Sequence, residues 1–336
     1  MLGDQAIRYP EDVHGGDIAT GCADPVVHGN QVITGDDSPD VGACLEIESH
    51  RQPLFAAAYR MLGTRADAED VLQEAWLRWN QVDHDAVNEP RAYLFRLVTR
   101  LALDQLRRVK ARREAYVGPW LPEPLITAPG AEDAAELAES VSMGLLVVLE
   151  TLAPVERAVF VLHEAFGFSH AEIADMLGRT ERAVRQLAYR GRQHVQARRP
   201  RHRHETTEDR QVTERFLAAT LGGDLTALLD ILAPDVTLVA DANGKSETPR
   251  QPVHGVQEVA GYLVSVVEFW PPALGVEITQ VNGGPGAVIT TQGQPFLVFA
   301  LDIDPADNRL REINALINPD KLAALSGQLP PVRETR

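Results

Sequence analysis

From about residue 43, apolar residues recur every three to four positions through the central part of the chain, and they alternate with polar residues near its end. The first spacing predicts helices at residues 43–62, 66–80, 91–113 and 132–150, and another beginning at Pro154. Beyond residue 207 the pattern predicts two helices divided by Gly222-Gly223, then a helix at 257–269, and strands at residues 236–240, 287–291, 296–303 and 309–317. A helical part followed by helices and a curved antiparallel sheet predicts a multidomain chain that ends in an α+β cone.

The clearest local signal is a helix–turn–helix within residues 168–192. Ser169, with Glu172 three residues later, forms a capping box, and Gly178 stands where a helix typically ends on a left-handed residue. Thr180 then caps a second helix. One side of that second helix is apolar and is predicted to pack: Val184, Leu187, Ala188 and Gly191.

The opposite side of the second helix carries Arg182, Arg185, Gln186 and Tyr189. Guanidinium groups pair with guanine edges and amides pair with adenine, and a helix fits the major groove. We therefore predict that this side reads DNA bases. An ordinary solvated helical hairpin is the alternative, because charge runs on helices are usually solvated faces.

The distribution of charge supports local nucleic-acid surfaces, although the formal net charge is −16. Residues 1–41 carry eight acids and one arginine, and residues 205–336 carry eighteen acids and nine bases. Between them, residues 90–113 carry eight bases and one acid, and residues 179–203 carry nine arginines and one acid. Two basic blocks between acidic ends predict two separate phosphate-binding surfaces.

Two consecutive predicted helices carry surfaces of opposite charge. The helix at 66–80 has an acidic side that includes Asp70, Gln73 and Glu74, for which solvation alone is the alternative to partner binding. The helix at 91–113 interleaves aromatic residues with arginines, which suits an opened nucleic-acid strand because bases stack on rings and on guanidinium planes. Contact with duplex phosphate alone is the alternative for that helix.

The segments GTRADAEDVLQEAWLRW and EPRAYLFRLVTRLALDQLRR resemble region 2 of bacterial extracytoplasmic-function sigma factors, and the helix–turn–helix resembles region 4 of the same family. The resemblance implies a sigma factor that directs promoter-specific initiation by RNA polymerase. It implies two partners: promoter DNA and the polymerase core, which is contacted at the β′ clamp helices and the β flap.

The resemblance also implies roles for individual residues. The residues expected to bind polymerase are Asp70, Gln73, Glu74 and Trp76. Together with the loop at 81–89, the residues expected to melt and capture the −10 element are Arg96, Arg100, Arg107, Arg108, Lys110, Arg112 and Arg113. The residues expected to recognise the −35 element are Arg179, Thr180, Arg182, Arg185, Gln186, Tyr189 and Arg190.

A proline-rich segment at 118–131 is predicted to be an extended linker, and its apolar residues predict that it docks rather than moves freely. Its sequence WLPEPL resembles a motif of those extracytoplasmic-function sigma factors that carry a SnoaL-like C-terminal domain. DANGK at 241–245 and INPDKL at 317–322 resemble two further motifs of that subgroup. The resemblance implies that the C-terminal domain rests against region 2 and tunes activity through Trp120, Leu121, Pro122, Glu123, Pro124, Leu125, Asn318, Pro319, Asp320, Lys321 and Leu322.

The resulting fold class is multidomain. Two all-α sigma domains, a region 2 helical bundle and a region 4 helix–turn–helix, are followed by an α+β SnoaL-like (nuclear-transport-factor-2-like) cone. The predicted divisions are a disordered tail at 1–41, region 2 at 42–117, the linker at 118–131, region 4 at 132–204, the cone at 207–325 and a tail at 326–336.

The sequence does not favour catalysis. No paired-carboxylate or nucleophile–base spacing links the candidate acid–base residues of the C-terminal domain, which are Asp235, Asp241, His254, Glu258 and Asp302. Cys22 and Cys44 belong to no cluster with metal-ligand spacing. We expect no enzyme activity, no metal and no cofactor. A small-molecule ligand of the cone and an anti-sigma protein stay open as further partners.

Three functional hypotheses follow. The first is a sigma factor whose activity is modulated by its SnoaL-like domain. The others are a one-component helix–turn–helix regulator with a ligand-sensing SnoaL-like domain, and a SnoaL-class enzyme fused to a DNA-binding region. Residues 66–113 favour the first, because a simple operator binder needs neither an acidic docking helix nor a strand-capture helix. The sequence has no apolar run of membrane-spanning length and no signal-peptide pattern, which predicts a cytoplasmic protein with no membrane partner.

Overall fold

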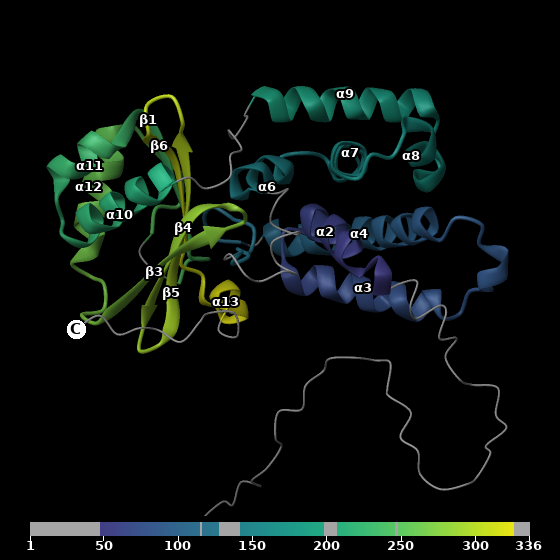
Figure 1. Cartoon of the computed structure of the whole chain (residues 1–336), viewed down its shortest axis with the longest axis horizontal. Helices are drawn as coiled ribbons and strands as arrows, with labels where there is room; N and C mark the ends of the chain where they lie inside the picture. The colour runs from purple at the N-terminus through teal and green to yellow at the C-terminus, as the bar shows by residue number, and fades with distance from the viewer. Residues whose placement is uncertain (1–47, 115, 128–141, 198–206, 246–247, 326–336) are drawn as a thin grey trace, which may run out of the picture.

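The computed structural model describes residues 48–114, 116–127, 142–197, 207–245 and 248–325, with the side chains of the first segment described as far as Arg108. The predicted tails at 1–41 and 326–336 lie outside these ranges. Figure 1 shows two groups of helices on one side and a domain built on a sheet on the other. Within the described ranges, no helix is both long enough and apolar enough to cross a membrane.

Three helices form the first module: α2 (Arg51–Leu62), α3 (Arg65–Trp79) and α4 (Pro90–Glu114), with a 3-10 turn, η1 (His84–Ala86), before α4. Their apolar faces enclose Tyr59, Trp79 and Phe95. The predicted single helix at 43–62 is wrong, because His50 interrupts the helical path and α2 begins only at Arg51. Pro53 explains the break: a proline fits the first turn of a helix, where backbone N–H groups have no intrahelical partner, but not the interior.

The second module contains α6 (Met143–Glu150), α7 (Pro154–Phe160), a π-helical turn η2 (Val161–Ala165), α8 (His170–Leu177) and α9 (Glu181–Ala197). The capping box of Ser169 and Glu172 is confirmed, and Gly178 ends α8 in the left-handed region at φ 62°. The predicted continuous helix at 132–150 is wrong at Ser142. This residue is extended, and its side chain accepts the N–H of Leu145, so that α6 starts at Met143. Residues 132–141 lie outside the described ranges.

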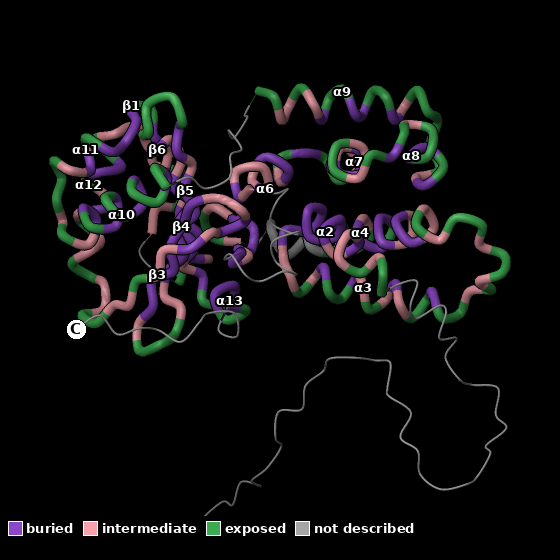
Figure 2. Tube along the Cα trace, in the orientation of Figure 1, coloured by how far each residue is buried: buried purple, intermediate pink, exposed green. Residues whose placement is uncertain are grey.

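The two helical modules share one continuous core. Buried residues of α2, α3 and α4 and buried residues of α6 to α9 belong to the same hydrophobic cluster. Phe95 of α4 stands at its centre, with ring centroids 4.8 Å from Phe166 and 5.0 Å from Phe168. In Figure 2 the facing sides of these helices are coloured as buried. The modules therefore pack as a closed pair rather than as two separate bodies.

The C-terminal domain is a six-stranded sheet with helices. Its elements are α10 (Thr207–Leu221), α11 (Leu225–Ile231), β1 (Leu232–Asp241), β2 (Val253–His254), α12 (Val256–Val267), β3 (Leu274–Val281), β4 (Gly284–Thr291), β5 (Gln294–Asp304), β6 (Arg309–Leu316), α13 (Pro319–Leu322) and η3 (Ala323–Leu325). The strand order is β2-β1-β6-β5-β4-β3. The predicted order of helices and strands is confirmed, and Asp224 caps α11 by accepting the N–H of Ala227.

One feature of the predicted sheet is wrong. β1 pairs with β6 in parallel, so that the sheet is mixed rather than wholly antiparallel. The alternation of polar and apolar residues did not predict strands β2 and β3, although β3 forms a tight hairpin with β4 through the turn at Asn282 and Gly283. Parallel pairing joins strands distant in the chain, and local alternation carries no information about that partner.

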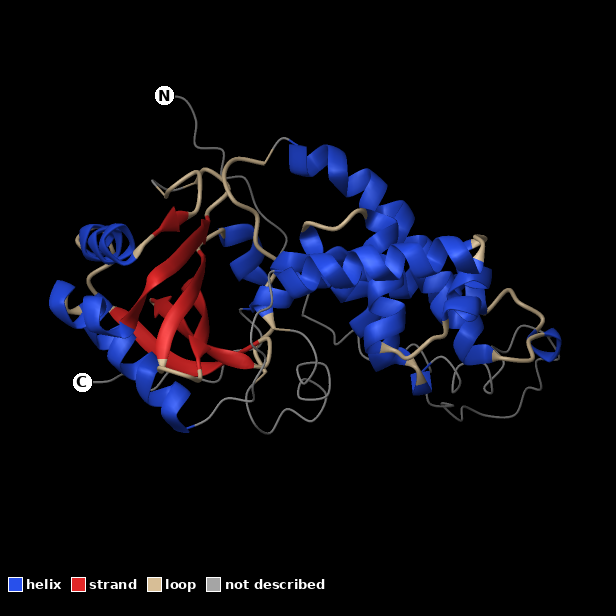
Figure 3. Cartoon of the chain, turned by 90° about the horizontal axis from the view of Figure 1, so that it is seen from above, coloured by secondary structure: helices blue, strands red, loops and turns tan. Residues whose placement is uncertain are grey.

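The two faces of the sheet have different neighbours. Alternate residues of a strand point to opposite faces. Phe299 and Leu301 of β5 pack with α10, α11 and α12, whereas Val298 and Ala300 pack with linker residues Leu121 and Ile126. Figure 3 shows the helices on one side of the sheet and the helical modules beyond the other. The second face thereby joins the C-terminal domain to the rest of the chain.

Candidate nucleic-acid interface and interdomain junction

The outer side of α9 is open and polar. Val184, Leu187, Ala188 and Gly191 are buried, as predicted. Figure 2 shows exposed and buried stretches alternating along this helix. The open side forms a shallow hollow of about 450 Å³, which is lined by Arg182, Arg185, Gln186, Tyr189 and Arg190. The predicted division of the helix into a packing side and a presenting side is confirmed.

Weak contacts hold the side chains of this open face. Arg185 lies 3.4 Å from Glu181, and Arg190 lies 2.7 Å from Glu156 of α7. The pair of Arg185 with Glu181 is exposed on both sides and contributes at most about 1 kcal/mol, so an external acceptor can replace that carboxylate, whereas the Glu156 side chain is only 19% exposed. Thr180 caps α9 by accepting the N–H of Ala183 at 3.3 Å, as predicted, while the neighbouring Arg179 is exposed.

The N-terminal half of α4 faces the second module. The guanidinium of Arg96 lies 3.5 Å from the carboxylate of Asp175, and Arg100 donates to the carbonyl of Met176 at 3.2 Å. Arg91 donates to the carbonyl of Phe166 at 3.1 Å, and its guanidinium lies 4.6 Å from the centre of the Phe168 ring. Three arginines of the basic helix are therefore engaged by α8 and by the turn before it.

The C-terminal half of α4 is more open. Arg107 and Arg108 are exposed, and Arg107 pairs with Asp104 one turn away at 2.9 Å. The backbone of Lys110, Arg112 and Arg113 continues the helix, but their side chains lie outside the described part of the structure. The predicted −10 residues thus divide into a pair that contacts the second module, Arg96 and Arg100, and a group near the end of the helix.

The predicted polymerase-binding residues lie on α3. Asp70 and Gln73 are exposed, and Glu74 pairs with Arg78 at 2.8 Å. Trp76 is half-buried and packs against the shared core. The spacing of Asp70, Gln73 and Glu74 places them on one side of the helix, so they can meet a partner together.

The linker is docked, as its apolar residues predicted. Glu123 is buried, its backbone N–H donates to the carbonyl of Gly63 at 2.8 Å, and its carboxylate accepts the N–H of Arg65 at 2.6 Å. The linker carboxylate therefore helps to begin α3. Burial raises the pKa of Glu123. A Cβ on Gly63, which has φ 76°, would lie 2.7 Å from the ring of Trp120, so this position requires glycine.

A buried ion pair ties the linker to the C-terminal domain. Asp241, fully buried at the end of β1, accepts the amine of Lys321 at 2.7 Å and the N–H of Leu121 at 2.8 Å. The Tyr116 hydroxyl donates to the same carboxylate, and the Lys321 amine donates to the Leu121 carbonyl. The amine also lies 4.0 Å from the centre of the Trp120 ring, close enough for a cation–π contact.

A second connection runs from the C-terminal domain to α2. Asn282, in the turn between β3 and β4, donates its side-chain amide to the Tyr59 hydroxyl at 2.9 Å. That hydroxyl donates to the carbonyl of Glu123 at 2.5 Å. Asn282 also exchanges two hydrogen bonds with the backbone of Leu125, at 2.8 and 3.1 Å. Burial raises the pKa of Tyr59, which keeps its hydroxyl protonated as a donor.

The second module joins the same junction through Arg157. This buried guanidinium forms two hydrogen bonds with Glu150, at 2.8 and 3.0 Å, and donates to the carbonyl of Met61 at 2.6 Å. Bidentate pairs of this kind fix relative orientation as well as contributing energy. The end of α2 therefore contacts the linker on one side and the second module on the other.

The predicted interdomain residues occupy different places in this junction. Leu121, Pro122, Glu123 and Pro124 are buried, and Leu125 and Trp120 are half-buried. Asn318 caps α13 and donates to the Tyr116 hydroxyl at 2.8 Å, and Leu322 packs with Leu121 in one cluster. Pro319 and Asp320 are exposed, and Asp320 pairs with Lys245 inside the C-terminal domain at 2.5 Å.

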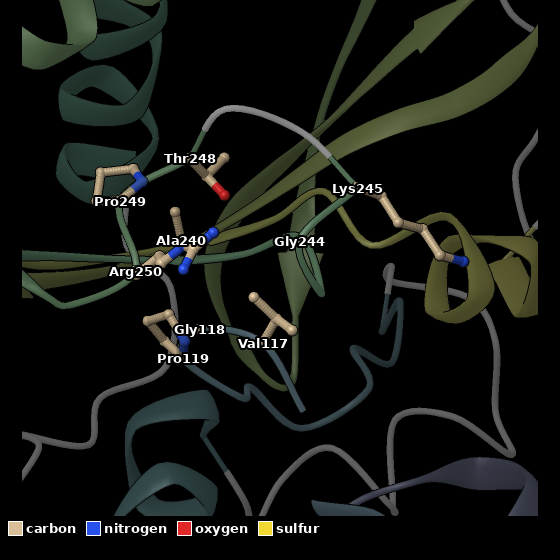
Figure 4. Close-up of a pocket in the computed structure, with 9 residues that line it drawn as sticks. All are labelled: Val117, Gly118, Pro119, Ala240, Gly244, Lys245, Thr248, Pro249 and Arg250. Carbon is tan, nitrogen blue, oxygen red and sulfur yellow. The ribbon is translucent and has the colours of Figure 1, made fainter. Parts of the chain in front are cut away.

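A pocket of about 380 Å³ lies beside the junction, between the linker and the loop after β1. Figure 4 shows Val117, Gly118 and Pro119 on one side and Thr248, Pro249 and Arg250 on the other. Lys245 extends away from the remaining labelled side chains, toward α13, where Asp320 lies. The two chain segments are thus close neighbours in space although more than a hundred residues separate them.

Sequence reasoning missed several residues of the junction. Tyr59 lies within the helix predicted at 43–62, where an aromatic residue indicates packing alone, and Asn282, Glu150 and Arg157 carry no local signal. Asp241 was weighed for acid–base chemistry, but its carboxylate is saturated by Lys321, Leu121 and Tyr116. The motif DANGK contained Asp241, so the resemblance pointed to the right strand end without indicating burial.

Two of the remaining acid–base candidates, Asp235 and His254, are engaged by other side chains. Asp235 is exposed and pairs with Arg311 at 2.6 Å, which lowers the pKa of that carboxyl. His254 bonds to the Thr237 hydroxyl at 3.1 Å on the edge of the sheet. Among the described residues, no group of His, Cys, Asp and Glu could hold a metal ion.

The chain is similar to known proteins along most of its length. Residues 47–113 match the family model described as Sigma-70 region 2, and residues 142–195 match the one described as Sigma-70, region 4. The extracytoplasmic-function (ECF) RNA polymerase sigma factor SigJ of Mycobacterium tuberculosis is 40% identical over 311 residues, covering 87% of this chain and 95% of that protein. A probable ECF RNA polymerase sigma factor, SigI, of the same species is 31% identical over 287 residues, covering 84% and 95%.

The fold is similar as well as the sequence. The crystal structure of Mycobacterium tuberculosis SigJ matches with a TM-score of 0.67 at 35% identity, covering 83% of this chain and 98% of that one. The match therefore spans the helical modules and the C-terminal domain together.

Proposed function

The chain belongs to the extracytoplasmic-function sigma factors, proteins that bind core RNA polymerase and promoter DNA, and from that premise we propose how its surfaces share the work. The open side of α9 reads the −35 element, and α4 with the loop at 81–89 captures the −10 element. The observation that carries this assignment is the hollow on α9, where arginines, a glutamine and a tyrosine face outward together.

We propose that each base-reading side chain on α9 has a distinct task. Arg182 and Arg185 donate to guanine edges, and Gln186 exchanges two hydrogen bonds with adenine. Arg179, Thr180 and Arg190 lie at the margin of this surface, where contacts to phosphate position the helix without selecting sequence. The weak, exposed ion pair of Arg185 with Glu181 exchanges for DNA at small cost.

Polymerase docking is proposed for two surfaces. Asp70, Gln73 and Glu74 of α3 contact the β′ clamp helices, and the second module contacts the β flap. The exposure of Asp70 and Gln73 and the common side that they share with Glu74 support the first contact. Attachment at two places raises the effective concentration of each DNA reader at its element, so the intrinsic affinity of α9 for DNA need not be high.

The closed packing of the two modules is proposed to be the resting form of the protein. Arg96 and Arg100, which we assign to −10 capture, contact α8 in this form. Arg100 is exposed and Arg96 is partly exposed, and DNA phosphate would have to replace the partners that both hold in α8. Polymerase binding would then separate the modules, release α4 and place both readers on the promoter.

We propose that the SnoaL-like domain modulates this change through the linker. Asp241 and Lys321 form hydrogen bonds with the backbone of Leu121, and Asn282 forms hydrogen bonds with Leu125 and Tyr59. The domain therefore contacts the linker at both ends of WLPEPL. Movement of the second module away from the first must pull on this segment. The SnoaL-like domain can therefore change the free energy needed to separate the two helical modules.

Run-off transcription with core polymerase tests these assignments. The full chain should direct initiation at its promoter, and Arg185→Ala should abolish most of that activity while Arg192→Ala, altered on the same helix outside the hollow, should retain it. A fragment of residues 42–204 should also direct initiation, at a level that differs from the full chain. If Arg185→Ala lowered the binding affinity for promoter DNA and for scrambled DNA equally, Arg185 would contact only phosphate. An unchanged level for the fragment would remove the modulatory role of the SnoaL-like domain.

Membership of the sigma-factor family also decides against the two other functional hypotheses. A one-component regulator would not account for a region 2 module that matches across residues 47–113. The hypothesis of a SnoaL-class enzyme fused to a DNA-binding region is not supported. The similarity in sequence and in fold is to sigma factors, and this similarity carries no catalytic assignment.

A further inference from the structure

The C-terminal domain contains a partly enclosed cavity of about 520 Å³ between α12 and the sheet. One wall is formed by α12 and the turn after it, including Leu263, Val266 and Trp270. The opposite wall is formed by residues of β1, β5 and β6, including Phe299 and Ala315. This space lies on the face of the sheet covered by helices (Figure 1), the opposite face from the linker junction.

The lining is apolar and aromatic. Trp270 and Phe296 meet edge to face with ring centroids 6.1 Å apart, and Phe269, which is 84% exposed, stands at the margin. Among the described residues that line the cavity, none carries a charge. Its polar groups are the hydroxyls of Thr248, Tyr262 and Ser265. Burial raises the pKa of Tyr262, so that its phenol stays neutral at physiological pH and is available as a donor.

None of the five ionisable residues weighed for catalysis belongs to this lining. Asp241 belongs to the same strand as Leu238 and Ala240, but alternate residues of a strand point to opposite faces. Leu238 and Ala240 face the cavity, and Asp241 faces the linker. The cavity thus has the volume of a ligand site, within the range of about 300–1,000 Å³, without the groups that would perform acid–base chemistry.

We propose that this cavity is a binding site for a neutral, largely apolar small molecule that contains a ring system. The aromatic walls supply contact area for ring edges and faces, and the hydroxyls orient the ligand through one or two hydrogen bonds. The apolar, aromatic and hydroxyl side chains of the lining favour a neutral ligand over a strongly charged one, because a buried ion without a partner is costly.

The position of the cavity connects it to the junction. Ile317 lines the cavity, and its backbone N–H donates to the carbonyl of Asp241 at 2.8 Å. Asn318, the next residue, donates to the same carbonyl at 2.9 Å and reaches the Tyr116 hydroxyl. A ligand in the cavity would therefore contact the end of β1, and the opposite side of that strand end binds the linker.

The test is a titration of the full chain with N-phenyl-1-naphthylamine, a neutral aromatic fluorophore, beside the anionic probe 1-anilinonaphthalene-8-sulfonate. The expected result is saturable binding of the neutral probe at one site per chain, with weaker binding of the anionic probe. Failure of the neutral probe to bind, or tighter binding of the anionic probe, would overturn the proposal.

Variants on both walls locate the site. Val266→Phe fills the cavity from α12 and Ala315→Leu fills it from β6. Each should weaken binding of the neutral probe by at least about tenfold, because the added atoms take volume in a close-packed interior. Leu225→Phe is the matched control, since Leu225 is 44% exposed on α11 and lies outside the lining. Unchanged binding in whichever wall variant keeps the wild-type circular dichroism would place the probe elsewhere and refute the site.

Discussion

The two proposed DNA readers differ in what surrounds them. On α9 the side chains assigned to base reading face outward in one hollow, and Arg185 has only a weak, exposed contact with Glu181 at 3.4 Å. On α4, Arg91, Arg96 and Arg100 contact the second module, and the aromatic residues between them lie in the shared core. One reader is open, whereas the other has its aromatic side covered and its exposed or partly exposed arginines held by partners in the second module.

This difference implies an order of events. Exposed ion pairs contribute at most about 1 kcal/mol each, so the polar contacts of α4 alone would not keep the modules together. The shared core stabilises the closed pair more strongly, because burial of aromatic rings such as Phe95, Phe166 and Phe168 removes substantial apolar surface from water. Release of α4 therefore needs a partner that compensates for the loss of this core. We propose that core RNA polymerase, which sigma factors bind, is this partner.

The largest effect is expected at the buried pair of the junction. Lys321→Met leaves Asp241 buried without its cation, so the free energy of unfolding of the C-terminal domain should fall by about 3–5 kcal/mol in a urea titration. Amide exchange in the linker and in α4 should accelerate with it, because the linker is no longer held. Lys245→Met is the matched control, since Lys245 pairs with Asp320 in solvent and should cost under about 1 kcal/mol. Similar effects of the two substitutions would contradict the role of the buried pair.

A comparably large effect is expected where the second module covers α4. Phe168→Ala removes a buried ring that contacts Phe95 and Arg91, and such a change typically costs about 3–5 kcal/mol. Amide exchange should accelerate in α4 more than in α3, because only α4 loses its cover. Phe269→Ala, which truncates a ring that is 84% exposed, serves as the control. Unchanged protection of α4 would show that the closed packing does not depend on this aromatic cluster.

An effect of intermediate size is expected on DNA binding by α9. Arg185→Ala should weaken binding to the −35 element by about 1–3 kcal/mol, as loss of a bidentate base contact does, with little change on scrambled DNA. Fluorescence anisotropy with labelled duplexes at fixed salt measures both affinities. Arg192→Ala is the control on the same helix, because Arg192 pairs with Glu164 and lies outside the hollow. A larger loss for Arg192→Ala would place the reading surface elsewhere.

The smallest effect is expected at the exposed ion pair between the modules. Asp175→Asn removes the partner of Arg96, whose contact is long at 3.5 Å, and should lower stability by less than about 1 kcal/mol. Run-off transcription should rise slightly, because the closed form loses one contact. Asp230→Asn, on the exposed side of α11, is the neutral comparison. A large loss of stability in Asp175→Asn would mean that polar contacts, rather than the shared core, hold the modules.

The sequence predicted the local features well. Ser169, Glu172 and Gly178 determine helix ends through contacts within a few residues, and each acts as expected. It could not predict the pairing of β1 with β6 or the contact of Asn282 with Tyr59, because these join segments about seventy or more residues apart. The covering of α4 belongs to the same class, since nothing near Arg96 indicates that Asp175 faces it.

The α9 face shows why half of the candidate site was accessible from sequence. A single amphipathic helix carries both its packing side and its presenting side in one short periodic stretch. The junction is different, because Lys321, Leu121 and Asp241 come from three distant segments and meet only in the folded chain. The family motifs WLPEPL, DANGK and INPDKL indicated all three segments, but they did not indicate that Asp241 and Lys321 form a buried ion pair.

The central claim is that the modules are closed in the free protein and separate on polymerase. Spin labels at Asn80→Cys, at the end of α3, and Gln193→Cys, on α9, with Cys22 and Cys44 replaced by serine, allow the distance between modules to be measured by double electron–electron resonance. Both labelled residues are exposed. One short, narrow distance in the free chain, replaced by a longer distance with core polymerase and promoter DNA, is the predicted result. An identical distance distribution in both states would contradict the account.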